Sequence, residues 1–150
     1  MFSSSPTTTI SARPGRIHPF AGTYRQVGHE TGIVDASPHR LVAMLFDGCL
    51  DAIAEARCAL RSSDVAAKAS AVSRAARIVD EGLRGALDLR GGGPLAADLD
   101  QLYAYLAMQL TMANLRNDEA TLEQCQRLLA PLRDAWTSIA PRGDIVPSAR

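Results

Sequence analysis

Apolar residues recur at helical spacing in four long segments between residues 38 and 139, and strand-like alternation is almost absent. The segments cover residues 38–61, 65–90, 94–116 and 118–139. Connections of only a few residues force neighbouring helices to run antiparallel. The pattern therefore predicts an all-α fold, an antiparallel four-helix bundle.

Capping signals support these boundaries. Ser37 can cap the first helix, with Pro38 at the first helical position, where its missing N–H costs nothing. A run of three glycines ends the second helix, and a proline follows it at the start of the third. The remaining signals are Ser63 or Asp64 before the second helix, Asn117 or Asp118 before the fourth, and Pro131, which should kink the fourth helix near Ala130.

Two of the helices carry more apolar surface than one core can bury, because a bundle helix needs a single stripe about 100° wide. The first helix has two adjacent apolar lines, and the third adds two tyrosines and two methionines to its leucine stripe. The excess predicts a surface for a partner, for a further segment of this chain or for another subunit. The alternative is a wide core with scattered exposed side chains. The first helix's lines hold Leu41, Leu45, Gly48, Ala52 and Ala59, then Val42, Phe46, Cys49, Ile53 and Leu60, with Met44 beside them; the third helix adds Tyr103, Tyr105, Met108 and Met112.

Residues 20–34 provide a candidate for the further segment. Phe20, Tyr24 and Val27 follow the i, i+4, i+7 spacing of a short amphipathic helix. Three glycines weaken this helix by about 1 kcal/mol each relative to alanine. We expect a weakly held segment that covers a groove and can be displaced, or an arm that packs on the bundle permanently.

Composition limits the remaining possibilities. Residues 1–20, rich in Ser, Thr and Pro, and residues 141–150 are expected to be flexible tails around a helical domain at 21–140. The formal net charge is zero, which gives no electrostatic case for nucleic acid, and no apolar run approaches a membrane span. The N-terminus lacks the apolar core of a signal peptide. We expect a cytoplasmic protein whose three cysteines are reduced and buried.

No catalytic or metal-binding arrangement stands out. Ser37, His39 and Asp47 contain the residue types of a triad, but two helical turns separate the last two. The three histidines lack metal-ligand spacing and are expected to be solvated. The carboxylates at 47, 51 and 55 are expected to form a solvated face. We therefore expect no catalysis, no metal and no cofactor.

Several short motifs, in order and with their spacing, resemble the FliS family of flagellar secretion chaperones over about residues 24–139. The motifs are Tyr24-Arg25-Gln26-Val27, Ala36-Ser37-Pro38-His39-Arg40-Leu41, Met44-Leu45-Phe46-Asp47-Gly48, Gly91-Gly92, Leu99 with Leu102-Tyr103-Ala104-Tyr105, Ala113-Asn114-Leu115-Arg116-Asn117-Asp118 and Leu132-Arg133-Asp134-Ala135-Trp136.

The resemblance implies a helical-bundle chaperone that binds the disordered C-terminal segment of flagellin, keeps it from polymerising early and delivers it to the flagellar export gate. It also implies that the segment around Tyr24 and Val27 is a lid over part of the client's groove. Candidates for the groove, or for the core beneath it, are Leu41, Met44, Leu45, Tyr103, Leu106 and Leu110.

Two other classes of function stay open. The apolar excess also fits a self-associating structural bundle without a client, or a weak homodimer. A small enzyme would require distant Asp, His or Cys residues to converge on a pocket.

Overall fold

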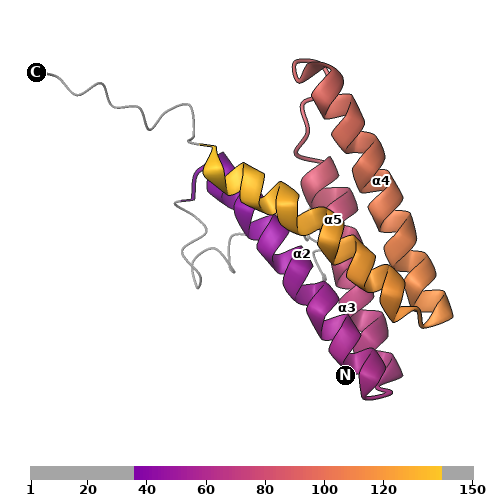
Figure 1. Cartoon of the computed structure of the whole chain (residues 1–150). Helices are drawn as coiled ribbons and strands as arrows, with labels where there is room; N and C mark the ends of the chain where they lie inside the picture. The colour runs from indigo at the N-terminus through magenta and orange to yellow at the C-terminus, as the bar shows by residue number, and fades with distance from the viewer. Residues whose placement is uncertain (1–35, 140–150) are drawn as a thin grey trace, which may run out of the picture. The chain divides into compact units, whose positions relative to one another are not determined.

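A computed structural model describes residues 36–139 of the chain. The described part is helical, and no strand occurs within it. The elements are α2 (Pro38–Arg61), α3 (Val65–Arg77), the π-helical η2 (Ile78–Arg84) that continues α3, α4 (Gly93–Arg116) and α5 (Glu119–Ser138). Consecutive helices run antiparallel (Figure 1), so the predicted all-α bundle is confirmed. The predicted flexible tails and the amphipathic segment at residues 20–34 lie outside the described residues.

Three of the predicted helix caps are present. The Ser37 hydroxyl accepts a hydrogen bond from the Arg40 N–H at 3.2 Å. The Asp64 and Asp118 carboxylates accept in the same way from the N–H groups three residues later. α5 continues through Pro131 to Ser138, so the proline interrupts the hydrogen-bond ladder without ending the helix.

The second helix ends earlier than predicted, at Arg84 rather than Arg90. Gly82 and Gly85 weaken the helix here, and the chain passes from α-helical to π-helical geometry at Ile78. Asp88 then captures the N–H groups of Arg90 and Gly91 with its carboxylate, at 3.1 and 2.9 Å. A local side-chain acceptor thus replaces the helical carbonyls, and residues 85–92 form a hairpin loop.

All four helices contribute to one apolar core. Its largest fully buried side chains come from every element of the bundle. They are Ile53, Val72, Val79, Leu83, Leu106, Leu110, Leu122 and Leu129, with Cys49 and Cys125.

The cysteine prediction is partly wrong. Cys49 and Cys125 are buried, as predicted, and burial raises the pKa of the Cys49 thiol to about 12. Cys58 is exposed. It lies about 100° around α2 from the buried Ala59, on the helix face away from the core. All three cysteines are free thiols.

A buried lysine joins the two turns opposite the hairpin. Lys68 of α3 is only 5% exposed, and its ammonium donates hydrogen bonds to the Asn114 carbonyl at 2.9 Å and to the Asn117 side chain. Asn117 has a left-handed backbone (φ 50°) and ends α4. The lysine charge therefore lies at the negative end of the α4 dipole, where a cation is stabilised.

We expect Lys68→Met to lower the free energy of unfolding by about 1–3 kcal/mol, because it removes the buried donor of two partly buried hydrogen bonds. Urea denaturation of the purified chain measures the change. Arg74→Met is the control, since Arg74 makes an exposed ion pair with Glu55 and should cost less than about 1 kcal/mol. Equal losses in the two variants would show that the Lys68 contacts add nothing beyond a surface ion pair.

Gly48 of α2 leaves room for a methyl group. A Cβ at this position would lie 3.6 Å from Ile78 Cδ1, an ordinary contact distance. Gly48→Ala should therefore raise the free energy of unfolding by about 0.5–1 kcal/mol, since alanine favours the helix. A fall in the urea midpoint would instead reveal an obligatory close approach at this point of α2.

Candidate functional site

The leucine stripe of α4 is buried along only half of its length, although Ala96 and Tyr103, on the neighbouring side of the helix, are buried in the other half. In the C-terminal half, Leu106, Leu110 and Ala113 are essentially inaccessible. In the N-terminal half, Leu99 and Leu102 are only partly buried, and Leu95 is 68% exposed. One continuous stripe therefore passes from the core to the surface as α4 approaches the hairpin loop.

The stripe of α5 behaves in the same way at the same end of the bundle. Leu122, Cys125 and Leu129 are buried, whereas Leu132 and Trp136 are partly exposed. Because α4 and α5 are antiparallel, the exposed half of each stripe lies toward the hairpin loop, where α2 also begins.

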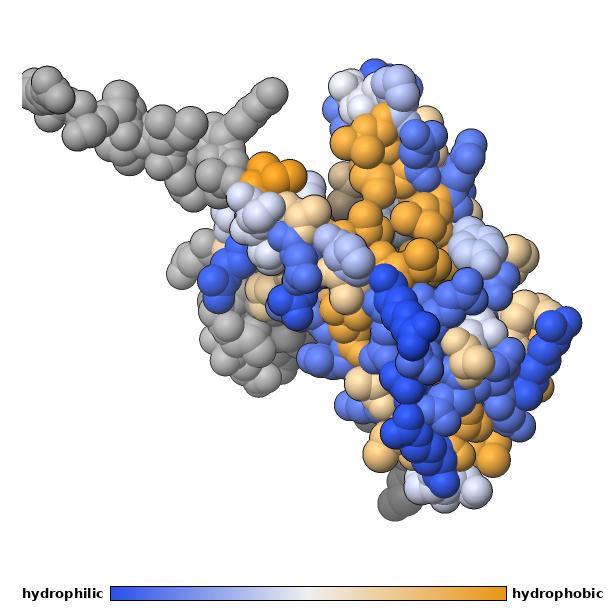
Figure 2. All heavy atoms as spheres, viewed as in Figure 1, coloured by the Kyte–Doolittle hydropathy of each residue, from blue (hydrophilic) through white to orange (hydrophobic). Residues whose placement is uncertain are grey.

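Two arms diverge at this end of the bundle. The C-terminal half of α5 lies along the start of α2, while η2 and the start of α4 form the other arm (Figure 1). Figure 2 shows apolar side chains gathered over η2 and the upper part of α4, beside the end of α5. We call this region the hairpin-end surface and define it by Leu41 and Leu45 of α2, Leu95, Leu99 and Leu102 of α4, and Leu132 of α5.

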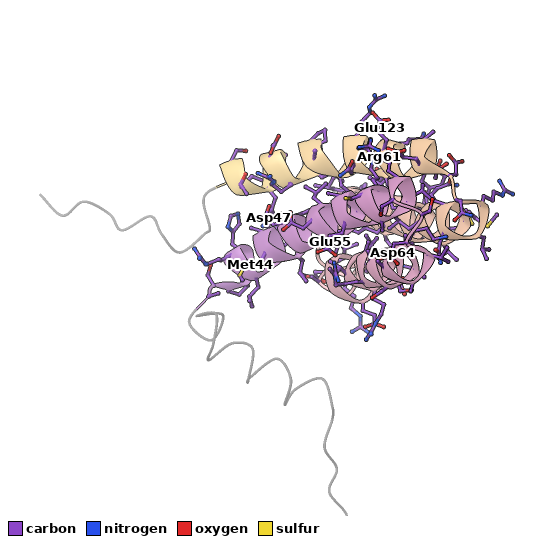
Figure 3. All side chains as sticks on the ribbon, turned by 90° about the horizontal axis from the view of Figure 1, so that it is seen from below. Met44, Asp47, Glu55, Arg61, Asp64 and Glu123 are labelled. Atoms are coloured by element: carbon purple, nitrogen blue, oxygen red, sulfur yellow. The ribbon has the colours of Figure 1, made fainter. Side chains whose placement is uncertain are left out.

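The opposite end of the bundle is closed by a polar seam between α2 and α5. Arg57 and Arg61 both form ion pairs with Glu119, and Arg57 also donates to the Gln126 side chain at 2.6 Å. These arginines lower the pKa of the Glu119 carboxyl. Figure 3 shows Arg61 of α2 and Glu123 of α5 along this seam. Charge thus covers this end of the α2–α5 contact, whereas at the other end Arg133 pairs with Asp47 beside the partly buried Leu132.

A hollow of about 400 Å³ lies between α3–η2 and α4. It is open to solvent and combines methionine with a charged rim. It is lined by Ala76, Arg77, Asp80, Glu81, Ala107, Met108, Thr111 and Met112.

The structure divides the six groove candidates between surface and core. Leu41 is 38% exposed, and Met44 and Leu45 are half-buried. Met44 lies near the start of α2 (Figure 3). Tyr103, Leu106 and Leu110 of α4 are buried in the core. The predicted lid residues, Tyr24 and Val27, lie outside the described residues.

His39 is not the solvated histidine that the sequence predicted. Its Nε2 donates to the Trp136 carbonyl at 2.8 Å, and Trp136 Nε1 donates to the His39 carbonyl at 2.9 Å. The two rings stack with centroids 4.9 Å apart. A carbonyl only accepts, so the proton of a neutral His39 ring lies on Nε2. The sequence places these residues 97 positions apart and gives no local signal of their contact.

The structure does not bring Ser37, His39 and Asp47 together as a catalytic triad. Ser37 caps α2 through its hydroxyl, and Asp47 forms an ion pair with Arg133 at 3.2 Å. The carboxylates of Asp47, Asp51 and Glu55 are exposed, as predicted, and Glu55 also pairs with Arg74 of α3. Within residues 36–139, no group of three or more His, Cys, Asp or Glu side chains is placed to hold a metal ion. No described helix is long and apolar enough to cross a membrane.

Comparison with known proteins identifies the family. The sequence model described as "Flagellar protein FliS" matches residues 20–143. The chain is 42% identical to the flagellar secretion chaperone FliS of Salmonella typhimurium, over 83% of this chain and 93% of the relative. The chain belongs to the FliS family. It is also 38% identical to FliSB of Pseudomonas aeruginosa, over 78% of this chain and 92% of the relative. The identity to FliS of Escherichia coli is 37%, over 75% of this chain and 83% of the relative.

The FliS landmarks in the chain now have structural roles. Ser37 and Pro38 begin α2, and His39 binds the Trp136 of the last landmark. Asn117 and Asp118 form the α4–α5 turn, in which Asn117 accepts from the buried Lys68 and Asp118 caps α5. These residues build the frame of the bundle, and five leucines of the hairpin-end surface also lie within the landmarks: Leu41, Leu45, Leu99, Leu102 and Leu132.

Proposed function

We propose that this FliS protein binds the C-terminal segment of flagellin on the hairpin-end surface, without any catalytic step. The observation that carries the proposal is the α4 stripe, whose apolar side chains continue from the core onto the surface at Leu102, Leu99 and Leu95. An amphipathic helix that laid its own apolar face between the two arms would complete the burial that the bundle leaves unfinished.

Coupled folding of the client explains how a modest surface can hold a flexible segment. Folding a disordered chain on a groove buries about 1,000–3,000 Å² and costs several kcal/mol of ordering free energy. Apolar contact supplies most of the gain, because the hairpin-end surface consists of leucines. Half-buried Met44 adds an adaptable contact close to this surface.

A chaperone bound to the C-terminal segment of flagellin would make that segment inaccessible to other flagellin molecules. We propose that the protein acts in the cytoplasm, that it keeps flagellin from polymerising before export, and that it delivers the client to the flagellar type III export apparatus. Four of its relatives are named flagellar secretion chaperone FliS in Salmonella typhimurium, Escherichia coli, Vibrio cholerae and Bacillus subtilis, which supports an export role. Displacement of a lid carrying Tyr24 and Val27 stays a prediction about residues outside the described part.

Seeded polymerisation of flagellin from the same organism tests the role. An equimolar amount of the chaperone should keep the flagellin monomeric, as measured by light scattering. Flagellin that lacks its C-terminal segment binds no chaperone in this account, so addition of chaperone should leave its scattering unchanged. Unchanged polymerisation of intact flagellin would contradict the proposal.

Self-association through the same leucines is the rival use of the surface. Multi-angle light scattering on the chain, alone and with client, separates the two. We expect a one-to-one complex with client; an obligate dimer that stays dimeric with client present would support self-association.

A further inference from the structure

The last turns of α5 are weakly connected to the rest of their own helix. Pro131 has no N–H, so the Arg127 carbonyl lacks its usual partner four residues later. Contacts with other helices therefore contribute more to the position of residues 132–138 than they would in an uninterrupted helix.

The polar contacts described between residues 132–138 and other helices all lead to α2. His39 and Trp136 exchange two hydrogen bonds and stack their rings, as described above. One helical turn earlier, Arg133 pairs with Asp47. Figure 3 shows Asp47 on α2, next to α5. We call the His39–Trp136 contact the clamp.

The clamp fixes one wall of the hairpin-end surface. Leu132 lies four residues before Trp136, one turn away on the same side of α5, and packs against the edge of the core. Leu99 and Leu102 belong to α4, on the other arm of the hairpin-end surface. Any movement of residues 132–138 away from α2 therefore changes the distance between Leu132 and the leucines of α4.

We infer that His39 and Trp136 are positioning residues for the client: by holding the end of α5 on α2, the clamp sets the width of the apolar groove that receives the client helix. The inference rests on the proposed function. When the end of α5 is already held in place, binding of the client does not cost the free energy of ordering that part of the protein.

The direct test is the affinity of a peptide from the C-terminal segment of the same organism's flagellin, measured by calorimetry far below the melting temperature. His39→Ala should weaken the affinity about tenfold, and Trp136→Phe, which keeps a stacked ring but loses the indole N–H, about threefold. Thr137→Ala is the control, because its exposed hydroxyl bonds only to Asp134 of the same helix. Its affinity should stay within about twofold of the wild type.

Two further measurements separate positioning from other roles. Amide hydrogen exchange of the free His39→Ala variant should rise at residues 132–138 and not at the core of α2 or α4. The double variant, His39→Ala with Trp136→Phe, should bind the peptide about as weakly as His39→Ala alone, because both changes open the same clamp. If His39 and Trp136 instead contacted the client independently, their losses of binding free energy would add.

The outcomes have distinct meanings. Wild-type affinity in both clamp variants, or unchanged exchange at residues 132–138, would overturn the clamp and leave the proposed function intact. Failure of the wild-type chain to bind the peptide would overturn the proposed function and the clamp's role together.

Discussion

Replacement of Leu106 by alanine is expected to lower the free energy of unfolding by about 3–5 kcal/mol. Leu106 is fully inaccessible at the centre of the core, so the substitution removes buried apolar contacts and leaves a cavity. Sequence spacing alone could not decide whether Leu106 belongs to the groove or to the core beneath it. The large expected loss follows from its position in the core, and urea denaturation monitored by circular dichroism measures it.

Leu102→Ala is the matched control, on the same stripe one turn earlier. Leu102 is partly buried, so we expect its truncation to cost less than that of Leu106, about 1–2 kcal/mol. The fraction of the Leu106→Ala chain that stays folded should bind client with nearly normal affinity, whereas Leu102→Ala should bind about tenfold more weakly. The opposite pattern would mean that the burial of these side chains does not separate core from groove.

The second large effect concerns client binding. Leu102→Asp is expected to weaken binding of the flagellin segment more than about 100-fold, because the complex would bury an unpaired carboxylate against apolar side chains. Fluorescence anisotropy of a labelled client peptide measures the affinity, and circular dichroism establishes that the variant is folded.

Leu95 and Leu115 offer a cleaner pair for the same claim. Both lie on α4 and are similarly exposed, at 68% and 72%, so an aspartate at either position should leave the fold unharmed. Leu95 belongs to the hairpin-end surface, whereas Leu115 lies near the opposite end of α4. We expect Leu95→Asp to weaken binding about tenfold and Leu115→Asp to have little effect. Equal effects would mean that the client does not distinguish the two ends of the bundle.

The sequence predicted the helices well because their signals are local. The Ser37 and Asp64 caps and the turn at Asn117 and Asp118 each depend on residues within a few positions. The second helix ends six residues earlier than predicted, because Asp88 competes for backbone N–H groups and glycines weaken the helix. The spacing of apolar residues, on which the prediction depended, contains no information about either effect.

The site was harder to predict because burial depends on how far neighbouring helices diverge. Leu95 and Leu110 belong to one stripe with the same spacing, yet one is exposed and the other fully buried. Helical periodicity gives the face of a residue but not the depth of packing along the helix axis. The His39–Trp136 contact was missed for a related reason, since it joins the first and last helices that the structure describes, 97 positions apart in the sequence.

One calorimetric titration tests the central claim most directly: the full chain against intact flagellin from the same organism, and against the same flagellin without its C-terminal segment. The account predicts one-to-one binding of intact flagellin with a negative heat-capacity change, the sign of apolar burial, and no measurable binding of the truncated protein. Equal binding of the two flagellins, or no binding of intact flagellin at tens of micromolar concentration, would contradict it.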